Sequence, residues 1–233
     1  MMKKYILPLF LAATFATSVF CQSKTDSSAA HKVIETEQQK IDLIFRLGEI
    51  HSDDQNIRKK AIAIAKEFGK NSKQYEGIPA KWKAVDSINL HKLECLIDTF
   101  GFETLIKYGE DAVFFVIQHA ELAIQQKYLA KMKEAANQGT LELSRLAMFE
   151  DRILLRSGKK QIYGTQVILD PKTGTYLVRP LEEPETVNLR RMSVGLSYMS
   201  EYMSAFNSKW DIADYKKRLP EIEELEEELN TKN

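Results

Sequence analysis

The chain has 233 residues, and its 33 lysines and arginines balance 33 aspartates and glutamates, which gives a formal net charge of +0. This balance, without any block of basic residues, argues against nucleic acid or a lipid surface as the binding partner. Apolar residues make up 44% of the chain, enough for one globular domain with a sizeable core.

The N-terminus has the order of segments found in bacterial secretion signals. A short basic start is followed by an apolar stretch over residues 5–15 and by small residues at 16–18. This stretch is shorter than the roughly twenty residues of a membrane-spanning helix, and no later uncharged segment reaches that length. We therefore expect a secretion signal over 1–21, a disordered leader over 22–31, no transmembrane helix, and an extracytoplasmic protein, periplasmic or secreted.

The sequence leaves two interpretations of Cys21 open. Cleavage after Cys21 would place Val19 and Cys21 in pockets that favour small residues and would leave Gln22 as the new N-terminus. Alternatively, Cys21 is the lipidated first residue of an outer-membrane lipoprotein, although the large Phe20 precedes it where a small residue is usual. In both cases Cys95 is the one cysteine that remains, so no intramolecular disulfide is expected.

Most of the remaining chain shows apolar residues at three- and four-residue intervals, which predicts helices. In chain order we expect helices over residues 31–50, 52–68, 80–100, 122–138, 141–156 and 185–206. The second would begin at a capping box, Ser52 with Gln55. A short connector would hold Gly101 and Gly109, and the apolar run 112–117 fits a buried helix or a strand, with polar flanks that favour helix.

The residue pattern changes near position 160. Residues 161–169 are rich in β-branched and aromatic side chains, a turn cluster follows at 170–174, and a second short strand is expected at 175–178. A hairpin over about 160–179 must pack on the helices, because two strands are seldom stable alone. The expected fold class is therefore mainly α: a single helical domain over 32–206 with one small β-hairpin, then an acidic C-terminal helix or tail over 207–233.

Polar residues in the second predicted helix form the first part of a candidate site. Asp54 and Arg58 are four residues apart and share a helix face with Gln55 close by. They could form an ordinary surface ion pair. Alternatively, Arg58 binds an anionic ligand group while Asp54 holds its guanidinium in place.

His119 is the candidate general acid or base. It follows the apolar run and Gln118, so it is either a satisfied core histidine or a proton-transfer group at a pocket wall. Asp151 and Arg152 are neighbours on a helix and point about 100° apart, so we expect one of them to face inward. An inward arginine must be paired or bind an anion, and Asp151 joins His119 as a candidate catalytic residue.

The segment 161–166 would form a hydrogen-bonding wall if it were a regular strand. Gln161, Tyr163 and Thr165 would then share one face, near Gln166, and Gly164 would allow a close backbone approach. Arg190 and Arg191 on the following helix would close this wall or remain solvated.

These motifs, in this order, resemble those of an uncharacterised bacterial family of unknown function. The motifs are Asp54-Gln55-x-x-Arg58, Gln118-His119-Ala120, Asp151-Arg152, Gln161-x-Tyr163-Gly164-Thr165-Gln166 and Arg190-Arg191. The resemblance spans about residues 40–205 and implies that these positions form one site. It implies no substrate. The family pattern often has Asp after Q-H-A, where this chain has Glu121, which keeps the carboxylate.

Three functions are open at this point. The first is an exported domain that binds a small ligand or a protein partner through a polar pocket. The ligand-binding residues would be Asp54, Gln55, Arg58, Gln118, Arg152, Gln161, Tyr163, Thr165, Gln166, Arg190 and Arg191. The second is a hydrolase or lyase for an anionic or amide-bearing substrate, with His119 as general acid or base. The third is a structural helical domain. No cofactor or metal is expected, because one histidine with scattered carboxylates falls short of the usual ligand sets.

Overall fold

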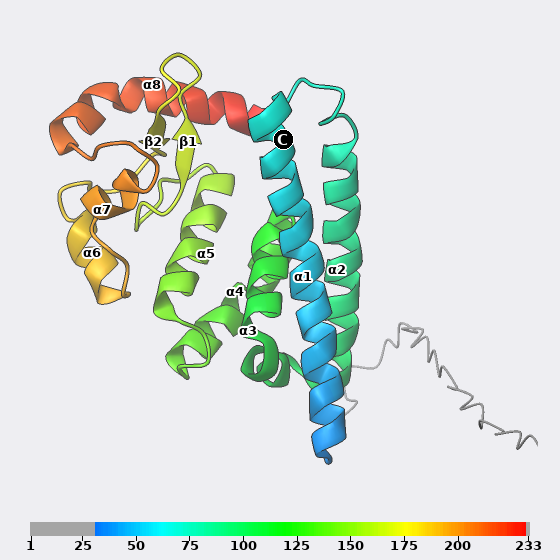
Figure 1. Cartoon of the computed structure of the whole chain (residues 1–233). Coiled ribbons are helices and arrows are strands. Elements are labelled where there is room, and N and C mark those ends of the chain that lie inside the picture. The colour runs from blue at the N-terminus through cyan, green and yellow to red at the C-terminus, as the bar shows by residue number, and fades with distance from the viewer. Residues whose placement is uncertain (1–30, 232–233) are drawn as a thin grey trace, which may run out of the picture. The chain divides into compact units, whose positions relative to one another are not determined.

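The computed structural model describes residues 31–231, so the expected secretion signal, Cys21 and nearly all of the leader lie outside the described residues. The described residues form eight helices and one two-stranded antiparallel hairpin (Figure 1). This confirms the mainly α fold class with a small β-hairpin.

Five helices form the larger part of the fold. These are α1 (Glu37–Phe68), α2 (Ile78–Phe100), α3 (Phe102–His119), α4 (Leu122–Asn137) and α5 (Leu143–Arg156). The first three pack against one another, α3 contacts α4, and α4 contacts α5. Figure 1 shows α1 and α2 running side by side. Their buried faces make one core, to which Phe102, Phe114 and Phe149 contribute fully buried rings. Each such ring stabilises the fold by about 1.5–3 kcal/mol.

Helix α1 is continuous, and the helix start expected at Ser52 was wrong. The capping box lies instead at Thr36, whose hydroxyl accepts a hydrogen bond from the Gln39 backbone N–H while the Gln39 side chain bonds the Thr36 backbone. Ser52 accepts a hydrogen bond from Asn56 within the helix. No glycine or proline interrupts residues 49–68, and the buried stripe of α1 passes through this point without a break.

Helix α3 passes through Gly109, where a connector was expected. Gly109 departs from helical geometry, with φ −161° and ψ 53°, so the helix is kinked there. A Cβ atom at Gly109 would lie 2.6 Å from Leu47 Cδ1 on α1. The missing side chain therefore lets α1 and α3 approach closely. The apolar run 112–117 is helical and buried on most sides, as the sequence indicated.

The hairpin pairs β1 (Val167–Leu169) with β2 (Tyr176–Val178), and Val167 lies opposite Val178. The strand expected from residue 161 is therefore shorter, because residues 161–166 form a loop. The expected helix over 185–206 is also two helices, α6 (Val187–Ser193) and α7 (Met199–Ser204).

A turn at Gly195, with φ 75°, separates α6 from α7. A left-handed backbone of this kind favours glycine and ends a helix. The methionines on the two sides of this turn differ in burial: Met192 is 56% exposed, whereas Met199 and Met203 are buried.

The last helix, α8 (Ile212–Thr231), packs on β2 and completes a second core with the hairpin, α6 and α7. Tyr215 and Ile222 are the buried side chains that α8 contributes. Arg179, next to β2, forms a two-pronged ion pair with Glu226 of α8. Within residues 31–231, no helix has both the length and the apolar character needed to cross a membrane.

Candidate functional site

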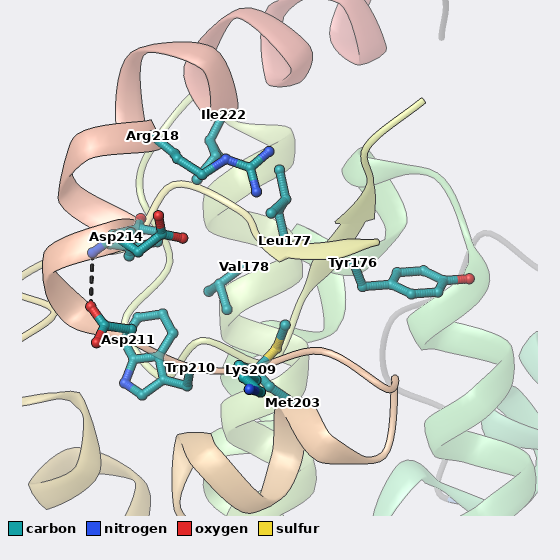
Figure 2. Close-up of a pocket in the computed structure, with 11 residues that line it drawn as sticks. Tyr176, Leu177, Val178, Met203, Lys209, Trp210, Asp211, Asp214, Arg218 and Ile222 are labelled. Carbon is teal, nitrogen blue, oxygen red and sulfur yellow. Dashed lines mark hydrogen bonds between the residues drawn. The ribbon is translucent and has the colours of Figure 1, made fainter. Parts of the chain in front are cut away.

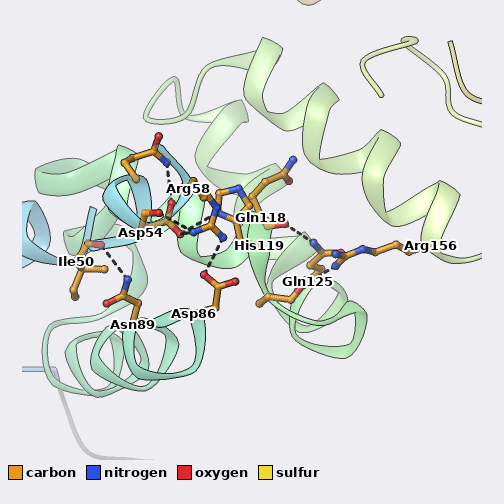
Figure 3. A network of polar contacts seen from close by, with 11 residues as sticks. Ile50, Asp54, Arg58, Asp86, Asn89, Gln118, His119, Gln125 and Arg156 are labelled. Carbon is orange, nitrogen blue, oxygen red and sulfur yellow. Dashed lines mark hydrogen bonds and ion pairs between the residues drawn. The ribbon is translucent and has the colours of Figure 1, made fainter. Parts of the chain in front are cut away.

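A buried carboxylate on α1 joins this helix to α3 (Figure 3). Asp54, 1% exposed, accepts a hydrogen bond from His119 Nδ1 on α3 at 3.0 Å and an ion pair from Arg58 Nη1 at 2.7 Å. Its other oxygen accepts a hydrogen bond from Gln55 Nε2 at 2.8 Å. Burial raises the pKa of Asp54, but the hydrogen bond and charge of His119, with Arg58 and Gln55, lower it below 3.8 overall. Asp54 is therefore ionised at neutral pH.

Arg58 is held by a second carboxylate that the sequence analysis missed. Its Nη2 lies 2.9 Å from Asp86 Oδ1 on α2, and its guanidinium lies over the Trp82 ring at 5.0 Å from the centroid. Trp82 and Asp86 are four residues apart, so they share a helix face. That spacing was the available signal. With both carboxylates in place, the charge of Arg58 is already compensated.

The two ring nitrogens of His119 differ: Nδ1 is hydrogen-bonded to Asp54, whereas Nε2 has no hydrogen-bond partner in the described part of the chain. Its ring stacks on Phe115, and its side chain is 17% exposed. Because Asp54 accepts at Nδ1, the proton lies on Nδ1 and the lone pair on Nε2. Nε2 has no hydrogen-bond partner among the described side chains and backbone. Burial lowers the pKa of His119 below 6.5 despite the hydrogen bond and charge of Asp54, and Arg58 and Arg152 lower it further. The imidazole is therefore neutral at pH 7.

Arg152 on α5 is a partly buried charge without a carboxylate partner among the described residues. Its Nε is fully enclosed and unpartnered, and no carboxylate of the described chain lies within ion-pair distance of it. Burial and the charges of Arg156, Arg179 and Arg58, in that order, lower the pKa of Arg152 to about 10. The cation persists at neutral pH, surrounded by like charges.

We call Arg152, Arg156 and Arg179 the arginine cluster. Arg156 is exposed, and its Nη1 donates to the carbonyl of Ala120, the residue after His119, at 2.7 Å. Arg179 is paired with Glu226. Glu226 thus pairs with Arg179 and the charge of Glu121 acts on Arg156, so Arg152 is the member of the cluster without a carboxylate partner.

Asp151, the neighbour of Arg152, is completely buried and serves the loop 161–166. Its carboxylate accepts hydrogen bonds from the backbone N–H groups of Ile162, Tyr163 and Thr165 at 2.7–3.0 Å, and from the Thr165 hydroxyl at 2.9 Å. Burial raises the pKa of Asp151, and these hydrogen bonds oppose that rise. Both carboxylate oxygens are therefore engaged in holding the loop.

Gln161 closes the same loop from its other end. Its Nε2 donates to the carbonyls of Gln166 and Arg179, and its Oε1 accepts from the Gln166 N–H at 2.9 Å. Gly164 lies at φ 67°, and a Cβ there would lie 3.0 Å from Met199 Sδ. The strand face expected at 161–166 is therefore wrong. The segment is a loop because glycine takes a left-handed backbone and Asp151 and Gln161 collect its polar groups.

Two arginines of the chain satisfy carbonyls of this loop. Arg191, 1% exposed, donates from Nε to the carbonyl of Ser197 and from Nη1 to those of Tyr163 and Gly164. Arg190 donates to the carbonyl of Ile162 at 2.7 Å. With Asp151, Gln161 and Thr165 they form what we call the loop network, in which the buried charges meet backbone groups.

The remaining predicted residues have less defined surroundings. Gln118 is buried, its backbone carbonyl accepts from Gln125 Nε2 at 2.7 Å, and its side-chain oxygen is unpartnered in the described structure. Gln166 donates from Nε2 to the hydroxyl and carbonyl of Thr165. The Tyr163 phenol has no hydrogen-bond partner within residues 31–231.

The predicted residues thus divide into two groups. Asp54, Gln55, Arg58 and His119 lie together, and the loop network gathers most of the others. Arg152 connects the two groups, because it follows Asp151 in the chain and its charge acts on His119.

Two hollows in the described surface lie away from these groups. A pocket beneath the hairpin, lined by Val178, Met203, Trp210 and residues of α8, has a volume of about 30 Å³ (Figure 2). That holds water but no metabolite. A groove of about 440 Å³ between α1 and α2 is lined by the apolar side chains of Ile57, Val85 and Ile88 and by five polar or charged residues. Neither contains His119 or Arg152. Over the described part of the chain, no three His, Cys, Asp or Glu side chains are grouped to hold a metal ion.

Residues 41–213 match the model of a family of unknown function, DUF6624, and the chain therefore belongs to that family. This confirms the resemblance to an uncharacterised family. The match ends just after α8 begins, so Glu226 lies outside it. No curated protein and no solved structure matches the chain.

Proposed function

We propose that the protein binds a small anionic molecule at the arginine cluster, beside His119. The observation that supports this most strongly is Arg152, a guanidinium with an enclosed, unpartnered Nε and no carboxylate in ion-pair distance. A buried charge without a counter-charge costs several kcal/mol, and a bound anion would offset that cost.

The surroundings of Arg152 favour a small ligand over a protein surface. Its Nε is enclosed, so a ligand would meet the guanidinium at Nη1 and Nη2, which are not among the enclosed atoms, and a compact anion fits such a partly closed position better than a flat partner. Access would come from the side of Arg156, which is exposed, and of His119, which is partly exposed. Arg58 would not contact the anion strongly, because Asp54 and Asp86 already hold it.

Calorimetric titration of the purified chain with phosphate, sulfate and succinate tests this proposal. A hydrogen bond to a charged group contributes about 1.5–3 kcal/mol, so Arg152→Met should weaken binding of the preferred anion by roughly ten- to a hundredfold. The matched control is Arg46→Met. Arg46 is exposed on α1, twelve residues before Arg58 and so about 18 Å away along the helix axis.

Equal affinity of the parent and the Arg152→Met variant would contradict the proposal, as would the absence of binding to all three anions. An equal loss in Arg46→Met would show nonspecific attraction to positive charge instead of a site. A salt series separates these outcomes further, since binding to an enclosed site is screened less by salt than binding to surface charge.

We also infer that the protein acts outside the cytoplasm. The support is the basic, apolar and small-residue order of residues 1–21. Fractionation of cells that express the full chain, compared with a chain that lacks residues 2–21, tests export. In the same cells, Cys21→Ala tests the lipid anchor: release of a membrane-bound fraction would support lipidation, and an unchanged distribution would support cleavage after Cys21.

A further inference from the structure

We propose that the protein hydrolyses a phosphate monoester, with His119 as the general base, Asp54 as its positioning residue and the arginine cluster as the phosphate clamp. The inference rests on the proposed anion site and adds a substrate class and a reaction to it.

The charge of the arginine cluster selects the substrate class. Glu226 pairs with Arg179 and the charge of Glu121 acts on Arg156, so the three guanidinium groups carry one positive charge in excess, that of Arg152. A phosphate monoester is close to a dianion at pH 7 and offers three terminal oxygens. One guanidinium can donate two parallel hydrogen bonds to two phosphate oxygens. A ligand with a single carboxylate offers only one negative charge and two oxygens, so it would engage fewer of these donors.

The geometry of His119 suits a base that acts on water. Asp54 accepts the Nδ1 proton at 3.0 Å and is itself fixed by Arg58 and Gln55, so both the ring orientation and the tautomer are set. The unpartnered Nε2 then carries the lone pair, on a ring that Phe115 supports by stacking. A base oriented by a carboxylate, with its other nitrogen free, is the arrangement general-base catalysis requires.

The closeness of the clamp to the base completes the arrangement. The charge of Arg152 acts on His119, and Arg156 donates to the carbonyl of Ala120, the next residue in the chain. An anion held by these two arginines would therefore lie near the C-terminal end of α3, where His119 is the last helical residue. Guanidinium groups fixed in advance at the oxygens stabilise the charge of the phosphoryl transition state.

The reaction balances without any further reactant. Nε2 takes a proton from water as the water oxygen forms a bond to phosphorus and the bond between phosphorus and the ester oxygen breaks. The departing alkoxide, on the opposite side of phosphorus, takes a proton from solvent water, and the proton on Nε2 is released to solvent. The products are an alcohol and inorganic phosphate, and His119 returns to its neutral form.

Four charged groups from three helices face His119 and set its pH response. Asp54 on α1 raises its pKa, whereas Arg58 on α1 and Arg152 on α5 lower it, as burial does. Asp86 on α2 interacts with its charge as well. Because the overall pKa lies below 6.5, the rate should rise on the acid side below pH 6.5 and level off above it.

The test measures release of phosphate by the purified full chain from p-nitrophenyl phosphate, glycerol phosphate, sugar phosphates and nucleoside monophosphates. We expect turnover of at least one substrate. His119→Asn should lower kcat by about a hundredfold or more, since general-base catalysis contributes about 10²–10⁴. The same variant should bind inorganic phosphate within about threefold of the parent.

The control is His91→Asn, the same change at an exposed histidine of α2. It should leave turnover unchanged, and an equal loss in both variants would overturn the role of His119. Asp54→Asn should lower kcat more than it changes KM and should move the acid limb of the pH profile. A purely structural role of Asp54 would leave the limb in place.

Two results separate this inference from the proposed function. If phosphate binds with the expected dependence on Arg152 but no monoester is hydrolysed, the hydrolase is wrong and the anion site stands. A preference for succinate over phosphate overturns the substrate class alone. Absence of anion binding overturns both. If the His119→Asn variant does not fold, His119→Gln is measured in its place. Lack of turnover by the parent chain contradicts the inference whichever variant is used.

Discussion

In the loop network, the buried charges of Asp151 and Arg191 end on backbone N–H and carbonyl groups. In the arginine cluster, Arg152 lies only a residue away from Asp151, yet its Nε contacts no acceptor. Both regions use charged side chains in a poorly solvated setting. In the loop network, backbone groups of the protein pair with the charged side chains. In the arginine cluster, Arg152 lacks such a partner and could pair with a bound anion. The difference teaches that burial of a charge alone does not distinguish a scaffold from a site, whereas the absence of a counter-charge does.

The strongest test of this contrast removes the centre of the loop network. Asp151→Ala should lower the free energy of unfolding by about 3–5 kcal/mol, because three backbone N–H groups and a hydroxyl lose their acceptor in a buried setting. Urea unfolding measures the loss. Asp151→Asn keeps one acceptor oxygen, so its free energy of unfolding should fall by less than that of the alanine variant. A loss below about 1 kcal/mol in the alanine variant would show that the loop stands without Asp151.

Arg191→Met should have the next largest effect. It removes donors to three carbonyl groups and the contact of the guanidinium with the Tyr202 ring at 4.7 Å. We expect unfolding free energy to fall by about 2–3 kcal/mol. Arg46→Met, at an exposed position, should change it by less than about 0.5 kcal/mol. Similar values for the two variants would contradict the account of Arg191.

Arg152→Met should act in the opposite direction. In anion-free buffer it should raise the unfolding free energy by about 1 kcal/mol, because an unpaired charge is replaced by an apolar side chain of similar length. Thermal and urea unfolding measure the gain. Added phosphate should stabilise the parent and leave the variant unaffected, since only a folded site binds it. A clear loss of stability in anion-free buffer would mean that Arg152 has a partner inside the protein.

The smallest effect concerns pH. The pKa of His119 is lower in the folded than in the unfolded chain, so the unfolded chain binds the proton more readily as the pH falls below 6.5. Stability should therefore decline from pH 7 downward until the folded pKa is passed. Asp54 contributes nothing in this range, because its own stabilisation is lost only below 3.8. His119→Asn should flatten the profile of unfolding free energy between pH 7 and 5. An unchanged profile would assign the decline to other groups.

Periodicity predicted the helices well where one apolar face runs along a whole element. It failed at Ser52, where a capping pattern lies inside α1, because the local capping preference is weak beside the continuous buried stripe around Ile50 and Asp54. It failed again at residues 161–166, because the β-branched composition does not reveal that Asp151 would collect the backbone N–H groups.

The candidate residues show the same limit. Spacing within a helix was enough to pair Asp54 with Arg58 and to suggest that one of Asp151 and Arg152 faces inward. It could not predict the contact of Asp86 with Arg58 or that of His119 with Asp54, because these pairs are 28 and 65 positions apart in the sequence. These contacts depend on how α1, α2 and α3 pack.

The sequence by itself determined the helical class, the small hairpin, the family and the residue types available for a site. These follow from local patterns, which need only the order of residues along the chain. The tertiary structure decided which charges are satisfied and which are left open. It made Asp151 and Arg191 supports of a loop, fixed the tautomer of His119 through Asp54, and left Arg152 among like charges. The physical reason is that desolvation and charge pairing depend on distances in space, which separations along the chain do not specify.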